Sequence, residues 1–169
     1  MNKKVLMVIA PADFRDEEYS ETRKALENIG AKVTVVNSTG QASKGMFGTI
    51  VKPDKNFYNI NVSEYDAVVF IGGSGMTAYF NNQQALSLAK EFNKSGKVVA
   101  AICIAPTILV NANILNGKNA TCFPSERDNI NAVGTYTGKP VEVDGKIITG
   151  NGPQAAKEFG KKIAEALRW

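Results

Sequence analysis

Histidine is absent from the 169-residue chain. Its absence excludes Ser-His-Asp and Cys-His catalysis within the chain, together with HExxH and other imidazole-dependent metal sites. Only two cysteines are present, Cys103 and Cys122. Two are too few for a disulfide framework, and their spacing is not that of a zinc-binding pair. We therefore expect free thiols in a reducing compartment, with no metal or organic cofactor.

Long apolar runs are also missing. No segment approaches the roughly 18 apolar residues of a membrane helix, and the first ten residues show no signal-peptide pattern. We expect a cytoplasmic protein with no membrane partner. The net charge is +4, but the basic residues are scattered, which favours a solvated basic surface over a nucleic-acid partner.

The length and the ordinary balance of 44% hydrophobic and 21% charged residues indicate one globular domain, residues 1–169. Short apolar runs predict buried parallel strands over residues 4–10, 31–36, 65–71 and 98–102. Amphipathic spacing predicts helices over residues 15–29, 82–93, 106–115 and 153–167. Asp144-Gly145 predicts a hairpin turn, and residues 38–61 read as a loop with a short strand near 48–52. The alternation indicates an α/β fold with a mostly parallel sheet.

Cys103 is the candidate nucleophile. It lies between an apolar strand and a helix, in A-A-I-C-I-A-P-T. Such a turn often strains the backbone and directs the side chain into a cleft, as in a nucleophile elbow. The neighbouring helix N-terminus favours a thiolate. The alternative is a buried cysteine that acts as a small apolar side chain.

Two glycines follow the apolar strand over residues 65–71. Gly72-Gly73 lets the backbone approach another group closely and direct an amide into the cleft. With the amide of Ile104, the amide of Gly73 would form an oxyanion hole for Cys103. The alternative is a tight strand exit, and the spacing does not match a GxGxxG dinucleotide motif.

Acidic residues open the first helix, in D-F-R-D-E-E-Y. Asp16 and Glu17 fit a role in stabilising the helix dipole. Glu18 is followed by an apolar helix face, so we expect its side chain to point inward over the strand ends. A buried carboxyl has a raised pKa and can exchange a proton with a thiolate.

At these residues the chain resembles the PfpI family of the class I glutamine-amidotransferase-like superfamily. The resemblance covers essentially the whole chain, through K-V-L-M-V-I-A, F-R-D-E-E-Y, V-V-F-I-G-G-S-G, A-A-I-C-I-A-P and V-D-G-K-I-I-T-G-N-G-P. It implies a flavodoxin-like three-layer sandwich that forms homodimers or larger oligomers. It also implies that Cys103 is the nucleophile, Glu18 its acid/base partner, and Gly73 and Ile104 the oxyanion amides.

The chain departs from the family pattern at three positions. Protease-like members have histidine directly after the cysteine, where this chain has Ile104. The deglycase branch has histidine before a proline, where this chain has Phe123 in T-C-F-P. Arg15 replaces the glutamate of the protease-like F-E-D motif. Cys122 adjoins Phe123 and lines the same cleft or belongs to the core.

Three functions remain open. The resemblance implies peptidase or amidase, glyoxalase, deglycase or redox-linked chaperone activity. A cysteine-dependent enzyme on small carbonyl or amide substrates needs one nucleophile and one acid/base, so it does not require histidine. A redox sensor would use oxidation of Cys103 without turnover. A binding module would keep the fold without the chemistry.

Overall fold

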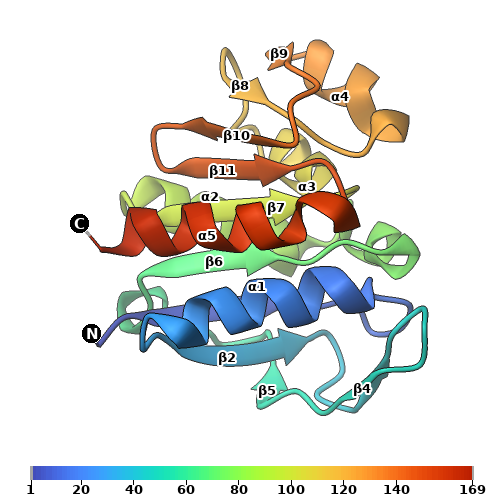
Figure 1. The fold of residues 1–169 in the computed structure, drawn as a ribbon, viewed down its shortest axis with the longest axis vertical. Helices are drawn as coiled ribbons and strands as arrows, with labels where there is room; N and C mark the ends of the chain where they lie inside the picture. Colours follow the sequence, from blue (N-terminus) through green and yellow to red (C-terminus); the bar gives the residue numbers. More distant parts are fainter. Residues whose placement is uncertain (1, 169) are drawn as a thin grey trace.

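A seven-stranded sheet forms the centre of the computed structural model, which describes residues 2–168 (Figure 1). The strand order is β10-β11-β7-β6-β1-β2-β5, and all neighbours are parallel except the β10–β11 hairpin. The prediction of a mostly parallel sheet is confirmed. Its strands are β1 (Lys4–Val8), β2 (Lys32–Asn37), β5 (Lys55–Asn56), β6 (Ala67–Phe70), β7 (Val98–Ile102), β10 (Val141–Asp144) and β11 (Ile147–Gly150).

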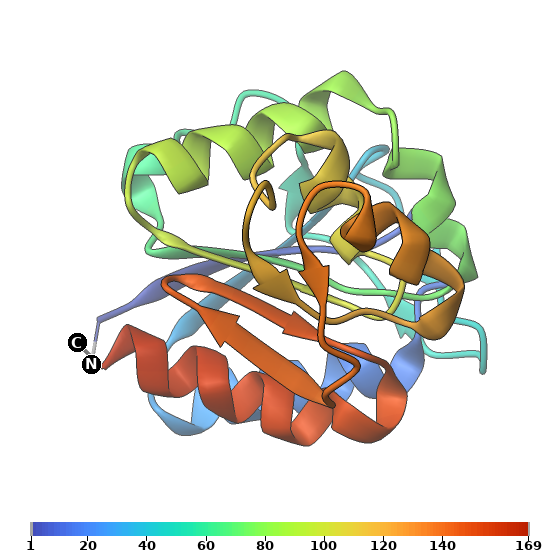
Figure 2. The same cartoon turned by 90° about the horizontal axis from the view of Figure 1, so that it is seen from above.

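Helices cover both faces of the sheet, which gives the predicted three layers (Figure 2). Helices α1 (Asp16–Asn28) and α5 (Ala156–Leu167) pack against each other on one face. Helices α2 (Gln83–Lys94) and α3 (Pro106–Asn111) lie on the other, and α4 (Arg127–Asn131) lies beyond β10. Within residues 2–168, no helix is both long enough and apolar enough to cross a membrane.

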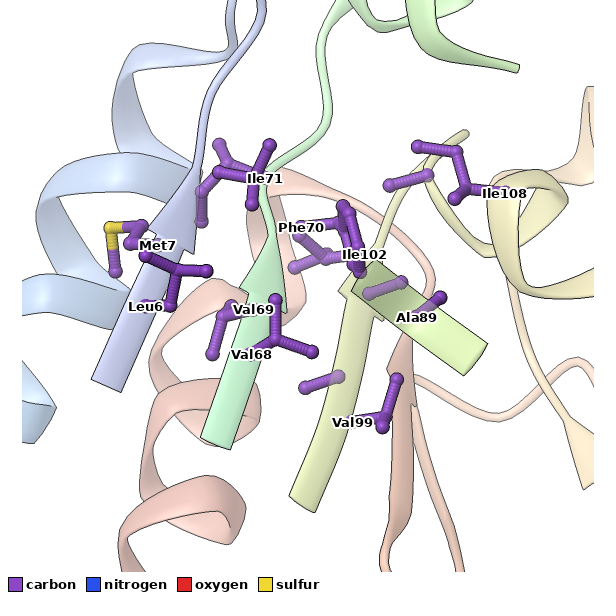
Figure 3. Close-up of a cluster of buried hydrophobic side chains, with 14 of the residues drawn as sticks. Leu6, Met7, Val68, Val69, Phe70, Ile71, Ala89, Val99, Ile102 and Ile108 are labelled. Atoms are coloured by element: carbon purple, nitrogen blue, oxygen red, sulfur yellow. The ribbon is translucent and has the colours of Figure 1, made fainter. Parts of the chain in front are cut away.

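The core forms where the apolar strands are buried on both faces (Figure 3). Every residue of β6 and all of β1 after Lys4 are fully buried. Such strands can lie only in the middle of a covered sheet, because burial removes apolar surface from water on both sides. The central strands are therefore rigid supports for the residues that follow their carboxyl ends.

The irregular parts differ most from the predicted elements. The helix expected over 106–115 ends at Asn111, and Asn113 then adopts a left-handed conformation with φ of 61°. The helix expected from residue 153 begins with one 3₁₀ turn, η4 (Pro153–Ala155). Between residues 38 and 61, β5 joins the sheet edge and a small hairpin forms. Its strands are β3 (Ser43–Lys44) and β4 (Ile50–Val51).

The remaining elements are short. A second small sheet pairs β8 (Asn119–Ala120) with β9 (Thr135–Tyr136). The other 3₁₀ turns are η1 (Val62–Glu64), η2 (Ser74–Tyr79) and η3 (Pro124–Glu126). The predicted Asp144-Gly145 turn is confirmed, with φ of 63° at Gly145 between β10 and β11.

Candidate active site

Three segments meet at the carboxyl edge of the sheet, where ligands bind in open α/β folds. They follow β1, β6 and β7, which lie side by side. The Arg15 amide donates to the Gly72 carbonyl at 2.9 Å, which ties the first segment to the second. Both segments reach Cys103 through the Glu18 side chain and the Gly72-Gly73 backbone. The chain thus brings its predicted site residues together from positions up to 86 residues apart.

Cys103 occupies a strained turn directly after β7. Its φ is 66°, a left-handed conformation that is unusual for a residue with a side chain. Its amide donates to the Gly150 carbonyl at 2.9 Å, and its carbonyl accepts from the Phe123 amide at 2.7 Å. These two bonds hold the backbone in the strained conformation, as the predicted nucleophile elbow requires.

Glu18 points inward from α1, as the sequence predicts, and its side chain is completely buried. Its Oε1 accepts from the Gly72 amide at 2.9 Å. Its Oε2 is also buried and has no hydrogen-bond partner among residues 2–168. A buried carboxyl with one unpartnered oxygen favours the protonated form, because leaving a charge there is costly.

Gly72 lies between the carboxyl and the thiol. A Cβ added to Gly72 would lie 2.4 Å from Glu18 Oε1, 2.5 Å from Cys103 Cβ and 2.7 Å from the Ile102 carbonyl oxygen. No side chain fits in that space. The absence of a side chain at Gly72 therefore allows Glu18 and Cys103 to converge.

Replacing Gly72 by alanine should destabilise the fold and separate the Glu18–Cys103 pair. The added methyl group has to displace backbone as well as side-chain atoms, and such overpacking costs roughly 1–3 kcal/mol. We expect a lower unfolding midpoint in urea and an altered rate of Cys103 alkylation.

The matched control is Gly96→Ala, where φ is 72° and no atom lies within 4 Å of the new Cβ. It should cost roughly 1 kcal/mol through backbone strain and leave Cys103 alkylation unchanged. A Gly72→Ala variant with wild-type stability and reactivity would refute this role of Gly72.

The electrostatics of Glu18 are dominated by its burial. Burial raises the pKa of Glu18 to about 8, and smaller opposing effects come from the Gly72 amide, Cys103 and Arg15. At pH 7 the carboxyl therefore carries a proton. It can donate that proton to a sulfur anion or to an oxygen that forms beside it.

Burial also raises the pKa of the Cys103 thiol to about 12, and the charge of Glu18 is the second cause. Burial therefore opposes the effect of the helix N-terminus, which the sequence analysis expects to favour a thiolate. Helix α3 has only six residues and begins three positions after Cys103, so its dipole does not outweigh the burial. While Glu18 is protonated, however, it carries no negative charge and does not repel a thiolate at Cys103. Activation of Cys103 thus depends on the protonation of Glu18.

The amides of Gly73 and Ile104 face the Cys103 sulfur, and both lower the pKa of the thiol. Gly73 has φ of 112°, and a Cβ there would lie 2.4 Å from the Arg15 amide nitrogen. Two backbone N–H groups that favour negative charge at the sulfur also suit an oxygen anion on an atom bonded to it. These are the two amides that the sequence analysis predicts for an oxyanion hole, and that role stays a prediction.

Asp16 and Glu17 in the first turn of α1 do more than stabilise the helix dipole. The sequence-based interpretation of these two residues is therefore incomplete. Asp16 Oδ1 accepts from the Phe47 amide and Oδ2 from the Thr49 amide, both at 2.9 Å. Although burial opposes it, these bonds hold the pKa of Asp16 below its usual range. Glu17 pairs with Arg15 at 3.0 Å. Asp16 therefore fixes the β3–β4 hairpin against the start of α1.

A cleft of about 270 Å³ adjoins the elbow. Its lining comes from the two segments that hydrogen-bond to Cys103, namely Phe123, Pro124, Asn151, Gly152, Pro153 and Gln154. Cys122 does not line it, because its side chain is fully buried in the core. The sequence did not predict that the side chains of Asn151 and Gln154 line a cleft. The only local indication is the N-G-P motif at residues 151–153, which marks a turn.

Among residues 2–168, no three cysteine, aspartate or glutamate side chains are grouped to hold a metal ion. The polar groups at the elbow are one thiol, one carboxyl and backbone amides. This set suits addition of sulfur to a carbonyl carbon, with a proton supplied from Glu18.

Comparison with known proteins extends over nearly the whole chain. A model of the DJ-1/PfpI family matches residues 3–166. An uncharacterised protein of Methanocaldococcus jannaschii is 42% identical, over 98% of this chain and 83% of that protein. A deglycase of Pyrococcus horikoshii is 33% identical, over 98% of this chain and 99% of the deglycase. The crystal structure of a ThiJ/PfpI domain protein from Brachyspira murdochii matches with a TM-score of 0.95 at 32% identity, covering 98% of this chain and 96% of the other.

Proposed function

The chain belongs to the DJ-1/PfpI family, and from this membership we propose that it is a cysteine-dependent enzyme acting on small reactive carbonyl compounds. The observation that carries the proposal is the buried Glu18 carboxyl, which shares the Gly72 turn with Cys103. A nucleophile and an acid/base in one buried site are the minimum for this chemistry. The similar Pyrococcus horikoshii protein is named a deglycase, which supports this substrate class.

The proposed reaction begins when the Cys103 thiol releases its proton to solvent and the resulting thiolate adds to the aldehyde carbon of a 2-oxoaldehyde. A carbon–sulfur bond forms, and the carbonyl electron pair moves to oxygen, where the amides of Gly73 and Ile104 stabilise it. Glu18 donates its proton to that oxygen and gives a hemithioacetal. The Glu18 carboxylate then removes the proton from the same carbon and returns it to the neighbouring carbon, while the hydroxyl proton passes to the second oxygen, which gives a thioester. Water attacks the thioester and gives one proton back to Glu18. The sulfur leaves as a thiolate that regains its proton from solvent, and the product is a 2-hydroxy acid.

Peptide hydrolysis fits the site less well. Cleavage of an amide requires a proton for the leaving amine and a base for the attacking water. The chain has no histidine to supply either, so Glu18 would have to serve both steps. Addition to an aldehyde has no leaving amine to protonate, and Glu18 is already a carboxylate when water attacks the thioester, so one carboxyl is sufficient. The geometry therefore favours a carbonyl substrate over a peptide.

A second candidate function is redox sensing. Glu18 Oε2 is buried and unpartnered among residues 2–168. A protonated carboxyl at this position could donate a hydrogen bond to the oxygens of a Cys103 sulfenic or sulfinic acid. This function would need a peroxide as the oxidant and no turnover. It rests on the same two residues as the enzyme proposal.

The experiment that tests the proposal is conversion of methylglyoxal by the purified protein at neutral pH. We expect lactate to accumulate without glutathione or any added cofactor, in an amount well above that of the protein. A parallel sample in dilute hydrogen peroxide is analysed by peptide mass spectrometry. Oxygen added to Cys103 without lactate in the first sample would contradict the enzyme and favour the sensor. Absence of both results would contradict both functions.

A further inference from the structure

Arg15 lies at the edge of the candidate active site, where the protease-like pattern has a glutamate. It is the N-cap residue of α1, three positions before Glu18. Its amide donates to the Gly72 carbonyl at 2.9 Å, and a Cβ on Gly73 would lie 2.4 Å from the same nitrogen. The backbone of Arg15 is therefore fixed against the turn that supplies one oxyanion amide.

The guanidinium group of Arg15 is held in place from two sides. Its Nε and Nη2 both donate to Oε2 of the Glu17 carboxylate, Nε at 3.2 Å and Nη2 at 3.0 Å. Its plane lies over the Phe47 ring, with Cζ 4.8 Å from the ring centroid. Asp16 binds the Phe47 amide and so fixes the hairpin that carries this ring. A half-buried arginine with two restraints presents its remaining donors in a defined direction.

One edge of the guanidinium stays open. Glu17 occupies the edge formed by Nε and Nη2, and Nη1 has no partner among the hydrogen bonds of residues 2–168. The fork of Nη1 and Nη2 matches the two oxygens of a carboxylate. Its side chain retains 27% exposure, so a small molecule can reach it.

We propose that Arg15 is a specificity-determining residue that binds a carboxylate group on the substrate through its open guanidinium edge. This role rests on the proposed function and extends it, because Arg15 would favour 2-oxoaldehyde substrates that carry a carboxylate. Phe47, whose ring supports the guanidinium, is 68% exposed, so this part of the hairpin is open to solvent.

The charges around Cys103 are compatible with this role. Arg15 lowers the pKa of Glu18, although burial dominates that pKa. The hydrogen bond to Glu17 is the main cause that raises the pKa of Arg15, and Glu18 and Cys103 add smaller raising effects when they are ionised. Glu18 is neutral at pH 7, and Asp16 is engaged by two backbone amides. Glu17 is a further anion nearby, and it is already paired with Arg15.

The test compares two alkylating agents that attack the same sulfur. Iodoacetate carries a carboxylate and iodoacetamide does not, and both form a carbon–sulfur bond and release iodide. The ratio of their rates at Cys103 therefore cancels any change in the thiol pKa. We expect Arg15→Gln to lower the iodoacetate-to-iodoacetamide ratio by roughly fivefold to tenfold. Arg15→Lys, which keeps the charge but loses the fork, should give an intermediate ratio.

Arg23→Gln is the matched control. Arg23 lies on the same helix, pairs with Glu27 at 3.2 Å and stands over the Tyr19 ring, but it is two turns further from the elbow. Its replacement should leave the ratio unchanged. The wild-type ratio should also fall in 1 M salt, because exposed charges are screened. Equal ratios in wild type and Arg15→Gln, or a salt-independent wild-type ratio, would overturn the inference.

The alkylation ratio requires no turnover. A protein that fails to convert methylglyoxal but shows the Arg15-dependent ratio would contradict the enzyme proposal and leave the carboxylate-binding role standing. A protein that makes lactate with an Arg15-independent ratio would keep the enzyme and lose this role. The two ideas therefore fail separately.

Discussion

Cys103→Ser should remove all measurable conversion of methylglyoxal. The serine hydroxyl is almost isosteric with the thiol, so the elbow and its bonds to Gly150 and Phe123 should persist. An alkoxide is far harder to form than a thiolate, and the chain has no histidine to take the hydroxyl proton. Glu18 is protonated at pH 7 and cannot act as that base. We therefore expect lactate formation to fall to the background rate.

Cys122→Ser is the control for this variant. Cys122 is the only other cysteine, and its side chain is fully buried in the core. Burial raises the pKa of its thiol to about 12 as well, with the charge of Glu126 as the second cause. Among residues 2–168, the buried carboxyl side chains are those of Asp16 and Glu18, and neither is a cause of the Cys122 pKa shift. We expect turnover within about twofold of wild type. Full activity in Cys103→Ser, or equal losses in both variants, would contradict Cys103 as the nucleophile.

The sequence predicts the central strands and the position of Cys103 well, because local patterns determine them. A strand made of a continuous apolar run buries all its side chains only inside a sheet that is covered on both faces. For this reason β1, β6 and β7 lie near the predicted ranges. A residue directly after such a strand must lie at its carboxyl end. The inward direction of Glu18 follows in the same way from the apolar face of α1. These features need no knowledge of distant contacts.

The short strand predicted near 48–52 is observed as β4. Its pairing with β3 and the activation of the thiol could not be predicted, because both depend on tertiary structure. Asp16 reaches Phe47 and Thr49 across more than thirty residues, and no local pattern marks that pairing. The cleft wall at Asn151 and Gln154 is likewise brought in by the pairing of β11 with β7. The thiol pKa depends on burial, which a helix-dipole argument from sequence neglects.

Glu18→Gln should separate binding at the sulfur from turnover. Glutamine keeps an oxygen to accept from the Gly72 amide and places an N–H donor where Oε2 stands. Alkylation of Cys103 should therefore persist, and above pH 8 it should be at least as fast as in wild type, where an ionised Glu18 opposes the thiolate. Proton transfer is lost, so lactate formation should fall by roughly 10²–10⁴-fold. Unchanged turnover in Glu18→Gln would contradict the acid/base role.

The same variant should also change how stability depends on pH. The pKa of Glu18 is about 8 in the folded protein against 4.5 for an unperturbed glutamate. Between these values the folded protein binds more protons than the unfolded chain, so wild-type stability falls as pH rises. Between pH 5.5 and 7.5 the wild type should lose roughly 2–3 kcal/mol relative to Glu18→Gln in urea unfolding. Glu158→Gln, at an exposed position of α5, should keep the wild-type slope. Parallel curves for wild type and Glu18→Gln would mean that Glu18 is ionised in the native state, and it could then not donate the first proton of the proposed reaction.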